Sequence, residues 1–400
     1  FFLSHYEASR FNSYKDFFLR NEAASKIFVR KDKKPWKKGD KFIQKDLAKT
    51  LKRIARYGRD GFYKGPVAKL IENEMKRGNG LITLEDLENY SSKYRSPVKG
   101  TYKDFKIISM GPPSSGGTLL INMLNMLEFY PMDTIGWNSS DYIHIKTEVE
   151  RRAYADRAEH MGDPDFWDVP IDFLTSKRYA EKRIQNIQLG KATLSSSISA
   201  TKNFGYESPE TTHYSVVDQW GNAVSVTTTI NLGYGNGCIV DGAGFFLNNE
   251  MDDFSSKPGV PNAFGLVGNE ANAIEPAKRP LSSMTPTIVL KNDKPFLIIG
   301  SPGGSTIITT TMQTILNVID HNMDIKEAVC SARFHSQWLP DVIQFEPNSL
   351  TKDVRINLES KGHKLFPRSG FIGEANGILI TEDGFYGGGD CRGQTSAIGY

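Results

Sequence analysis

The spacing of apolar residues changes near Thr211, and this change limits the folds that the chain can adopt. Between residues 40 and 190, apolar positions recur every three or four residues, as in "KDLAKTLKRIARYG" and "SDYIHIKTEVERRAYADRAEH", which predicts helices. After Thr211 the spacing falls to two. Pairs of alternating segments flank the short turns "DQWGN", "KND" and "TED", which predicts three β-hairpins.

These elements predict an α+β fold with a helix-rich first half. Several antiparallel hairpins with helices packed outside them are arranged most simply as two stacked sheets between helical layers, a four-layer αββα sandwich. A short strand is expected at "DFKIISM", and helices are expected after "SPGGS" and at "IKEAVCSARF". Thr83 and Asp86 have the spacing of a capping box at a helix N-terminus.

Composition narrows the functional classes. No stretch of 18 apolar residues is present, so no membrane span is predicted in this chain. The three cysteines, Cys238, Cys330 and Cys391, allow at most one disulfide and contain no CxxC metal motif. The first hundred residues are basic, but no nucleic-acid-binding motif accompanies them, so we expect a solvated or subunit-facing surface and no nucleic-acid partner. Phosphate-loop, HExxH and GxSxG motifs are also absent.

Two glycines mark one candidate site. Gly303 and Gly304 lie between a strand that ends at Gly300 and a helix expected to begin near Thr306. Backbone N–H groups at a helix N-terminus have no partner within the helix, so such a pair can stabilise the oxyanion of an acyl-transfer intermediate. An ordinary strand-to-helix turn that uses glycine for its permissive backbone explains the same residues.

Two polar segments are candidates for binding a charged ligand. "LNNEMDDFS" places Asn248, Asn249, Glu250, Asp252 and Asp253 directly after an apolar segment, and such side chains bind an ammonium group or cap a turn. "RPLSSMTP" offers Ser282 and Ser283, which either bind a carboxylate or form a turn.

Thr211 begins the first alternating segment directly after the polar loop "YESPE". A threonine hydroxyl needs a base, and His213, a strand histidine, is more simply a packing residue. If the Glu210–Thr211 bond is cut, Thr211 carries its own α-amino group, whose pKa near 7.7–8.0 suits a base at neutral pH. The sequence thus raises the possibility of an N-terminal nucleophile.

"TTHYSVVDQWGNAVSVTTTIN", "FFLNNEMDDFS", "PLSSMTPTIVL" and "GSPGG" together resemble the small subunit of γ-glutamyltranspeptidases, a family of N-terminal-nucleophile hydrolases. Upstream, "GLITLEDLENY", "MGPPSSGGTLLINMLNMLE" and "RRAYADRAEHMGDPDF" resemble the C-terminal part of the large subunit, so the resemblance covers essentially all 400 residues. It implies a precursor that cuts itself at Glu210–Thr211. Residues 1–210 and 211–400 then stay associated as large and small subunits.

The resemblance also assigns roles. Thr211 becomes the nucleophile, Thr229 holds its hydroxyl, and Gly303 and Gly304 form the oxyanion hole. Further residues are implied in binding the γ-glutamyl head group: Asn231, Glu250, Asp253, Ser282 and Ser283. Phe264 stands in the lid over the pocket, where the family usually has tyrosine.

The implied reaction is γ-glutamyl transfer from glutathione or related amides to water, amino acids or dipeptides, with no metal or organic cofactor. The resemblance also implies a periplasmic or secreted protein. It further implies that a leader and part of the large subunit, including an arginine that binds the substrate carboxylate, precede Phe1. The alternatives are a cephalosporin acylase or polyglutamate-transferring relative, an inactive truncated fragment, or an unprocessed binding protein.

Overall fold

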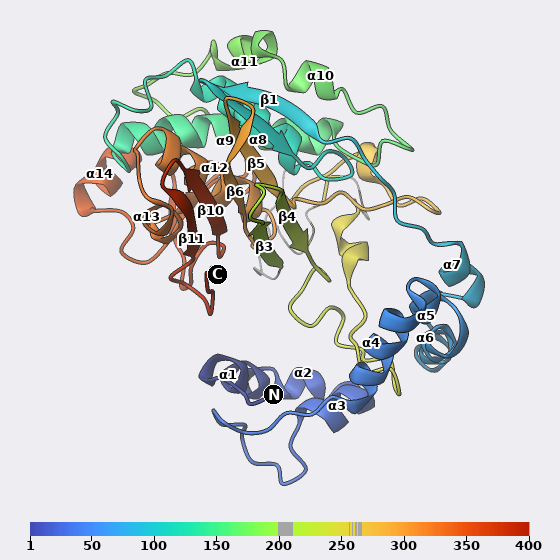
Figure 1. The fold of residues 1–400 in the computed structure, drawn as a ribbon. Coiled ribbons are helices and arrows are strands. Elements are labelled where there is room, and N and C mark those ends of the chain that lie inside the picture. Colours follow the sequence, from blue (N-terminus) through green and yellow to red (C-terminus); the bar gives the residue numbers. More distant parts are fainter. Residues whose placement is uncertain (199–210, 256, 258, 261, 263–265, 400) are drawn as a thin grey trace. The chain divides into compact units, whose positions relative to one another are not determined.

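The computed structural model describes residues 1–198, 211–255, 257, 259–260, 262 and 266–399 (Figure 1). The chain forms two compact units. Unit 1 comprises Phe1–Tyr94 and Leu232–Asn249, and unit 2 comprises Arg95–Asn231 and Glu250–Tyr400.

Unit 1 is built from short helices around an aromatic core. Its helices are α1 (His5–Ser13), α2 (Lys15–Phe18), α3 (Glu22–Phe28), α4 (Lys45–Tyr57), α5 (Asp60–Tyr63), α6 (Gly65–Gly78) and α7 (Leu84–Asn89). Phe11, Phe18, Phe28 and Phe42 pack against one another and are almost fully buried. The predicted capping box is present, since the Thr83 hydroxyl accepts from the Asp86 N–H and the Asp86 carboxylate accepts from the Thr83 N–H.

The apolar stripe predicted on α4 is only partly buried. Leu47 and Ile54 are half-buried, whereas the Leu51 residue is 55% exposed. Helical spacing decides which side chains share a face, but it does not decide what covers that face.

Unit 2 contains a six-stranded antiparallel sheet in the order β1-β2-β5-β6-β10-β11. Its strands are β1 (Val98–Tyr102), β2 (Phe105–Ser109), β5 (Thr287–Lys291), β6 (Lys294–Gly300), β10 (Asn376–Thr381) and β11 (Gly384–Gly389). The β5–β6 and β10–β11 pairs are two of the hairpins that the sequence predicts.

The third predicted hairpin forms a second sheet. Strands β3 (Thr212–Val217) and β4 (Ala223–Thr228) pair with each other and pack against β5, β6 and β10. The His213 ring lies so close to Gly300 that an added Cβ there would come within 2.3 Å of it. The Ser225 hydroxyl donates to the Ile299 carbonyl and accepts from the Thr287 N–H, which joins the two sheets.

Helices α8 (Gly116–Leu127) and α12 (Thr306–Ile319) cover the face of the large sheet away from the β3–β4 hairpin, and α9 (Ser140–His160) packs against α8 (Figure 1). Helix α9 is buried along nearly its whole length, because α8 and α14 contact it as well. Three of its buried charged groups form one cluster, in which the Glu148 carboxylate accepts from both Arg151 and Arg152. The α+β class and the stacked antiparallel sheets predicted from the sequence are confirmed.

The remaining elements surround this core. They are α10 (Ile171–Leu174), α11 (Lys177–Ile184), α13 (Ile325–Cys330), α14 (Lys352–Ser360), the three-stranded sheet of β7 (Phe334–His335), β8 (Ile343–Phe345) and β9 (Leu365–Pro367), and the 3-10 turns η1 (Ser195–Ser197), η2 (Glu250–Asp253) and η3 (Glu270–Asn272). Within the described ranges, no helix has the length and hydropathy needed to cross a bilayer.

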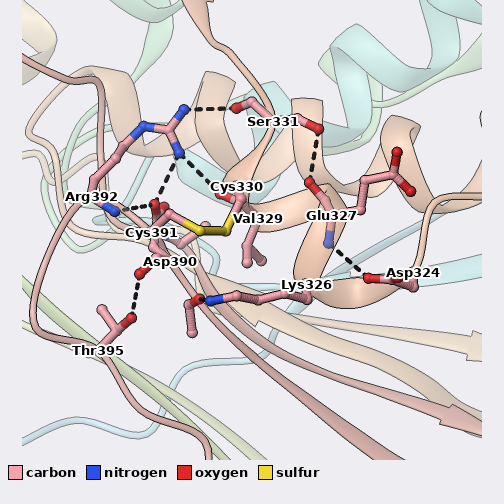
Figure 2. Close-up of a disulfide and its surroundings, with 12 residues drawn as sticks. Asp324, Lys326, Glu327, Val329, Cys330, Ser331, Asp390, Cys391, Arg392 and Thr395 are labelled. Atoms are coloured by element: carbon pink, nitrogen blue, oxygen red, sulfur yellow. Dashed lines mark hydrogen bonds and ion pairs between the residues drawn. A yellow bond between two sulfur atoms is a disulfide. The ribbon is translucent and has the colours of Figure 1, made fainter.

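A disulfide joins Cys330, at the end of α13, to Cys391, just after β11 (Figure 2). Cys238 remains a free thiol. Around the disulfide, Arg392 donates to the carbonyls of Val329 and Ser331 and pairs with the Asp390 carboxylate, so polar contacts also hold the two segments together.

Candidate active site

Thr211 precedes β3, and Thr229 follows β4. The hairpin register pairs Thr212 with Thr228, which brings the two flanking threonines opposite each other. The Thr211 hydroxyl donates to Thr229 Oγ1 over 3.4 Å. The spacing of 18 residues is therefore what two six-residue strands and their turn require.

Asn231 completes this end of the hairpin. Its N–H donates to Thr229 Oγ1 over 2.8 Å, its side chain is buried, and its φ is +71°. Because Thr229 Oγ1 accepts from both Asn231 and Thr211, its position is fixed by the backbone and directed at the Thr211 hydroxyl.

Gly303 and Gly304 occupy the turn between β6 and α12, with φ of +140° and +58°. The Gly303 carbonyl accepts from the Thr306 N–H and hydroxyl, and an added Cβ on Gly303 would lie 2.4 Å from that hydroxyl. Among the described residues, neither glycine N–H donates a hydrogen bond. Both amides therefore retain the capacity to stabilise an oxyanion near Thr211.

Glu250 and Asp253 lie at the two ends of the turn η2, and their carboxyl groups share a hydrogen bond. Burial, with the neighbouring Glu250 charge, raises the pKa of Asp253 to about 8, while Arg157 acts in the opposite direction. Burial also raises the pKa of Glu250. The pair consequently holds a shared proton near neutral pH, and a cation that enters the site would displace it.

Ser282 and Ser283 form a wall that a second segment holds in place. The Ser282 N–H donates to the Pro113 carbonyl, and the Ser282 carbonyl accepts from the Ser115 N–H and hydroxyl. Arg157 Nη2 donates to Ser283 Oγ over 3.3 Å. Arg157 and Ser115 were not identified as site residues from the sequence, although both occur in segments that carry the family resemblance.

Most of the predicted site residues line one pocket. Its lining consists of Thr211, Thr229, Asn231, Asp253, Leu266, Ser282, Ser283, Met284, Gly304 and Ile307. Glu250, which is hydrogen-bonded to Asp253, and Gly303, which precedes Gly304 in the chain, are not part of the lining. Glu210 and Phe264, predicted at the cleavage site and in the lid, lie outside the described residues.

A second, larger cavity of about 720 Å³ also reaches Thr211. Residues of β3, β10 and β11 and the C-terminal residues 394–399 line it. His213, which lines this cavity, bonds to the Thr227 and Ser215 hydroxyls and is buried, which fits the packing interpretation rather than a base for Thr211.

His144, Glu148 and His363 are the described residues whose ligand atoms lie close enough together to hold a metal ion. His144 Nδ1 and His363 Nε2 are 2.7 Å apart and hydrogen-bonded to each other. The Glu148 carboxylate already pairs with two arginines. The cluster is therefore a hydrogen-bonded, ion-paired network, and it contains none of the predicted site residues.

Comparisons with known proteins identify the family. The family model described as gamma-glutamyltranspeptidase matches residues 1–400. The chain is 48% identical to a glutathione hydrolase proenzyme of Escherichia coli over 94% of its own length, and it spans 64% of that relative. It is 44% identical to a glutathione hydrolase proenzyme of a Pseudomonas species, with 97% of this chain and 69% of the relative covered.

The fold has a solved counterpart as well. A cephalosporin acylase from Bacillus halodurans superposes with a TM-score of 0.84 at 23% identity, over 99% of this chain and 71% of the acylase. This likeness supports the fold, and the family model and curated relatives support the assignment. The chain belongs to the gamma-glutamyltranspeptidase family.

Proposed function

We propose that the protein is a γ-glutamyl transferase and glutathione hydrolase. The observation that carries the proposal is the junction at Thr211, whose hydroxyl bonds to Thr229 at the edge of a pocket with paired serines and a half-buried carboxylate. The relatives named glutathione hydrolase proenzyme support the same activity.

Maturation would begin at the Glu210–Thr211 bond. The Thr211 oxygen attacks the Glu210 carbonyl carbon, the peptide C–N bond breaks, and water then hydrolyses the ester, which leaves a free α-amino group on Thr211. Strands β1 and β2 precede this bond, and β2 pairs with β5, which follows it. The two predicted subunits would therefore remain joined through one sheet as a heterodimer.

Turnover would use the same oxygen. A γ-glutamyl amide would place its α-ammonium group at Glu250 and Asp253 and its α-carboxylate at Ser282 and Ser283, with Asn231 contacting both groups. Thr211 Oγ1 attacks the γ-carbonyl, its own amine accepts the proton, and that amine returns the proton to the leaving nitrogen. Water, an amino acid or a dipeptide then releases the γ-glutamyl ester.

The decisive test uses the full-length protein and γ-glutamyl-p-nitroanilide. We expect the wild type to yield two bands, the smaller beginning with Thr211, and to release p-nitroaniline. T211A is expected to remain a single band and to release none. A wild type that is cut at Thr211 yet leaves the substrate intact would overturn the assigned activity.

The acylase alternative makes a different prediction. A glutaryl amide lacks the α-ammonium group, so the half-buried Glu250 and Asp253 pair gains nothing from binding it. We expect the γ-glutamyl amide to be the better substrate, and equal kcat/KM values would favour a cephalosporin acylase. An unprocessed binding protein would remain one band under every condition.

We also propose a periplasmic or secreted location. The disulfide between Cys330 and Cys391 supports an oxidising compartment, because such bonds rarely persist in a reducing cytosol.

A further inference from the structure

Arg157 lies in the last turn of α9 and is 4% exposed. Within the described part of the chain, no carboxylate lies within ion-pair distance of its guanidinium, in contrast to Arg151 and Arg152 of the same helix. Burial lowers the pKa of Arg157 only to about 10, so the group keeps its charge at neutral pH. The Asp253 carboxyl group acts on Arg157 through its charge but forms no ion pair with it. A buried cation without a directly paired carboxylate is costly unless a ligand supplies one.

The guanidinium is directed at the serine wall. Its Nε donates to Ser115 Oγ over 3.0 Å, and Nη2 donates to Ser283 Oγ over 3.3 Å. Ser115 in turn donates to the Ser282 carbonyl over 2.9 Å. Arg157 thus holds Ser283 directly and Ser282 through one intermediate.

The direction of these bonds determines which hydrogen-bonding capacity of Ser283 remains for a ligand. Its oxygen accepts a hydrogen from Arg157, so its own O–H hydrogen must point elsewhere. Ser283 lines the pocket that also contains Thr211 and Asp253. A hydroxyl polarised from behind by a guanidinium is a strong donor to an anion in front of it.

We propose that Arg157 is the positioning residue for the substrate's α-carboxylate, acting through Ser283 and Ser115 and supplying the positive charge behind the serine wall. This inference rests on the proposed function, because it assigns a residue to the recognition of the same substrate. Arg157 does not line the pocket, so its effect reaches the ligand through the serine hydroxyls and through space.

Three p-nitroanilides separate this role from a general structural one. The γ-glutamyl compound has both α-groups, the glutaryl compound lacks the ammonium group, and the 4-aminobutanoyl compound lacks the carboxylate. In the full-length protein, we expect R157M to lower kcat/KM roughly 10- to 100-fold for the two substrates that have the carboxylate. Because Arg157 also lowers the pKa of Asp253, the ammonium-bearing 4-aminobutanoyl substrate should lose some kcat/KM, but clearly less than either substrate that has the carboxylate. Inhibition constants replace kcat/KM where turnover is slow.

Two further variants serve as controls. R157K keeps a cation but cannot reproduce the two-nitrogen contact, so an intermediate loss is expected. K146M removes another buried basic side chain of α9, which packs on the Tyr142 and Phe334 rings, and should leave the ratio among the three substrates unchanged.

The outcomes are distinct. Equal losses for all three substrates in R157M, with normal processing at Thr211, would show a structural role and overturn the inference. Absence of γ-glutamyl turnover in the processed wild type would instead overturn the proposed function.

Discussion

Thr229 is the residue on which the position of the Thr211 hydroxyl most directly depends. Its oxygen accepts from Thr211 and is held by the Asn231 N–H. T229A removes the acceptor and leaves the Thr211 hydroxyl free to rotate. We expect kcat for γ-glutamyl-p-nitroanilide to fall on the order of 10- to 100-fold, the cost of about 1.5–3 kcal/mol of lost orientation.

T229S is the matched control, because it keeps the hydroxyl and removes only a methyl group. It should stay close to wild type in kcat and in the rate at which the two bands appear. If T229A retained wild-type kcat after processing, Thr229 would have no part in holding the nucleophile.

The carboxyl groups of Glu250 and Asp253 predict that binding of the substrate's ammonium group depends on pH. Asp253, with a pKa of about 8 from burial and the Glu250 charge, is largely protonated below that pH. As the pH rises through 8 the carboxylate forms, so binding of the ammonium group strengthens. We expect the ratio of kcat/KM for γ-glutamyl over glutaryl p-nitroanilide to rise about tenfold from pH 6.5 to 8.

Taking a ratio removes the contribution of the Thr211 amine, which titrates in the same range but acts on both substrates. E250Q removes the neighbouring charge, so the pKa of Asp253 should fall and the rise should move to lower pH. A ratio that is independent of pH in the wild type would contradict the role of the acidic pair.

The residues of the site differ in how well the sequence could identify them. Thr211 and Thr229 can be matched because hairpin pairing fixes their spacing, and the structure brings them within hydrogen-bond distance. Arg157 could not be identified from the sequence. Periodicity alone does not distinguish a buried arginine that bonds to pocket residues from one that pairs with Glu148.

At the scale of elements, alternation and turn residues predicted all three hairpins, since local sequence decides strand pairing across short turns. The pairing of β2 with β5 could not be predicted, because the two strands lie far apart in sequence and tertiary packing brings them together. The same limit applies to the disulfide: three cysteines allowed one bond, and only the fold brings α13 to the end of β11.

That disulfide closes a loop with a sequence separation of 61 residues. Chain-entropy arguments assign such a crosslink about 4 kcal/mol of stabilisation. We expect the C330S/C391S double variant to unfold several degrees below wild type, with reductant lowering the wild type to the same Tm.

The C238S variant is the control, because Cys238 is a free, half-buried thiol bonded to Glu74 and Asn21. Its Tm should not respond to reductant any differently from that of the wild type. A double variant with the wild-type Tm would mean that the Arg392 contacts hold the segments without the crosslink.

At the scale of the whole molecule, the two compact units do not follow the predicted subunit boundary. Each unit combines residues from before Glu210 with residues from after Thr211. Sequence reasoning could place the cleavage site from the motif at Thr211 but not this interleaving, because the segment Leu232–Asn249 joins unit 1 through contacts distant in sequence. The predicted boundary at 210 remains to be tested by processing.

The free energy of unfolding should depend on pH through two buried groups whose effects are opposite. Burial lowers the pKa of His363 to about 3, well below its ordinary value of 6.5. As the pH falls below 6.5 the unfolded chain gains a proton that the folded chain does not, so stability decreases. Burial raises the pKa of Glu150 to about 8, so between pH 8 and 4.5 the folded state holds the extra proton and acidification stabilises it.

Substituting His363 or Glu150 by glutamine should therefore change the slope of stability against pH, in opposite directions for the two variants. His144 Nε2 faces the Gln188 carbonyl and must donate to it, so His144 Nδ1 accepts from His363 Nε2, and a glutamine at 363 can replace that donor. Relative to wild type, H363Q should lose about 1.4 kcal/mol less stability per pH unit below 6.5, and E150Q should lose correspondingly more. Thermal unfolding at pH 7.5, 6.5 and 5.5 measures both variants, and parallel Tm profiles for the three proteins would show that neither group is linked to folding.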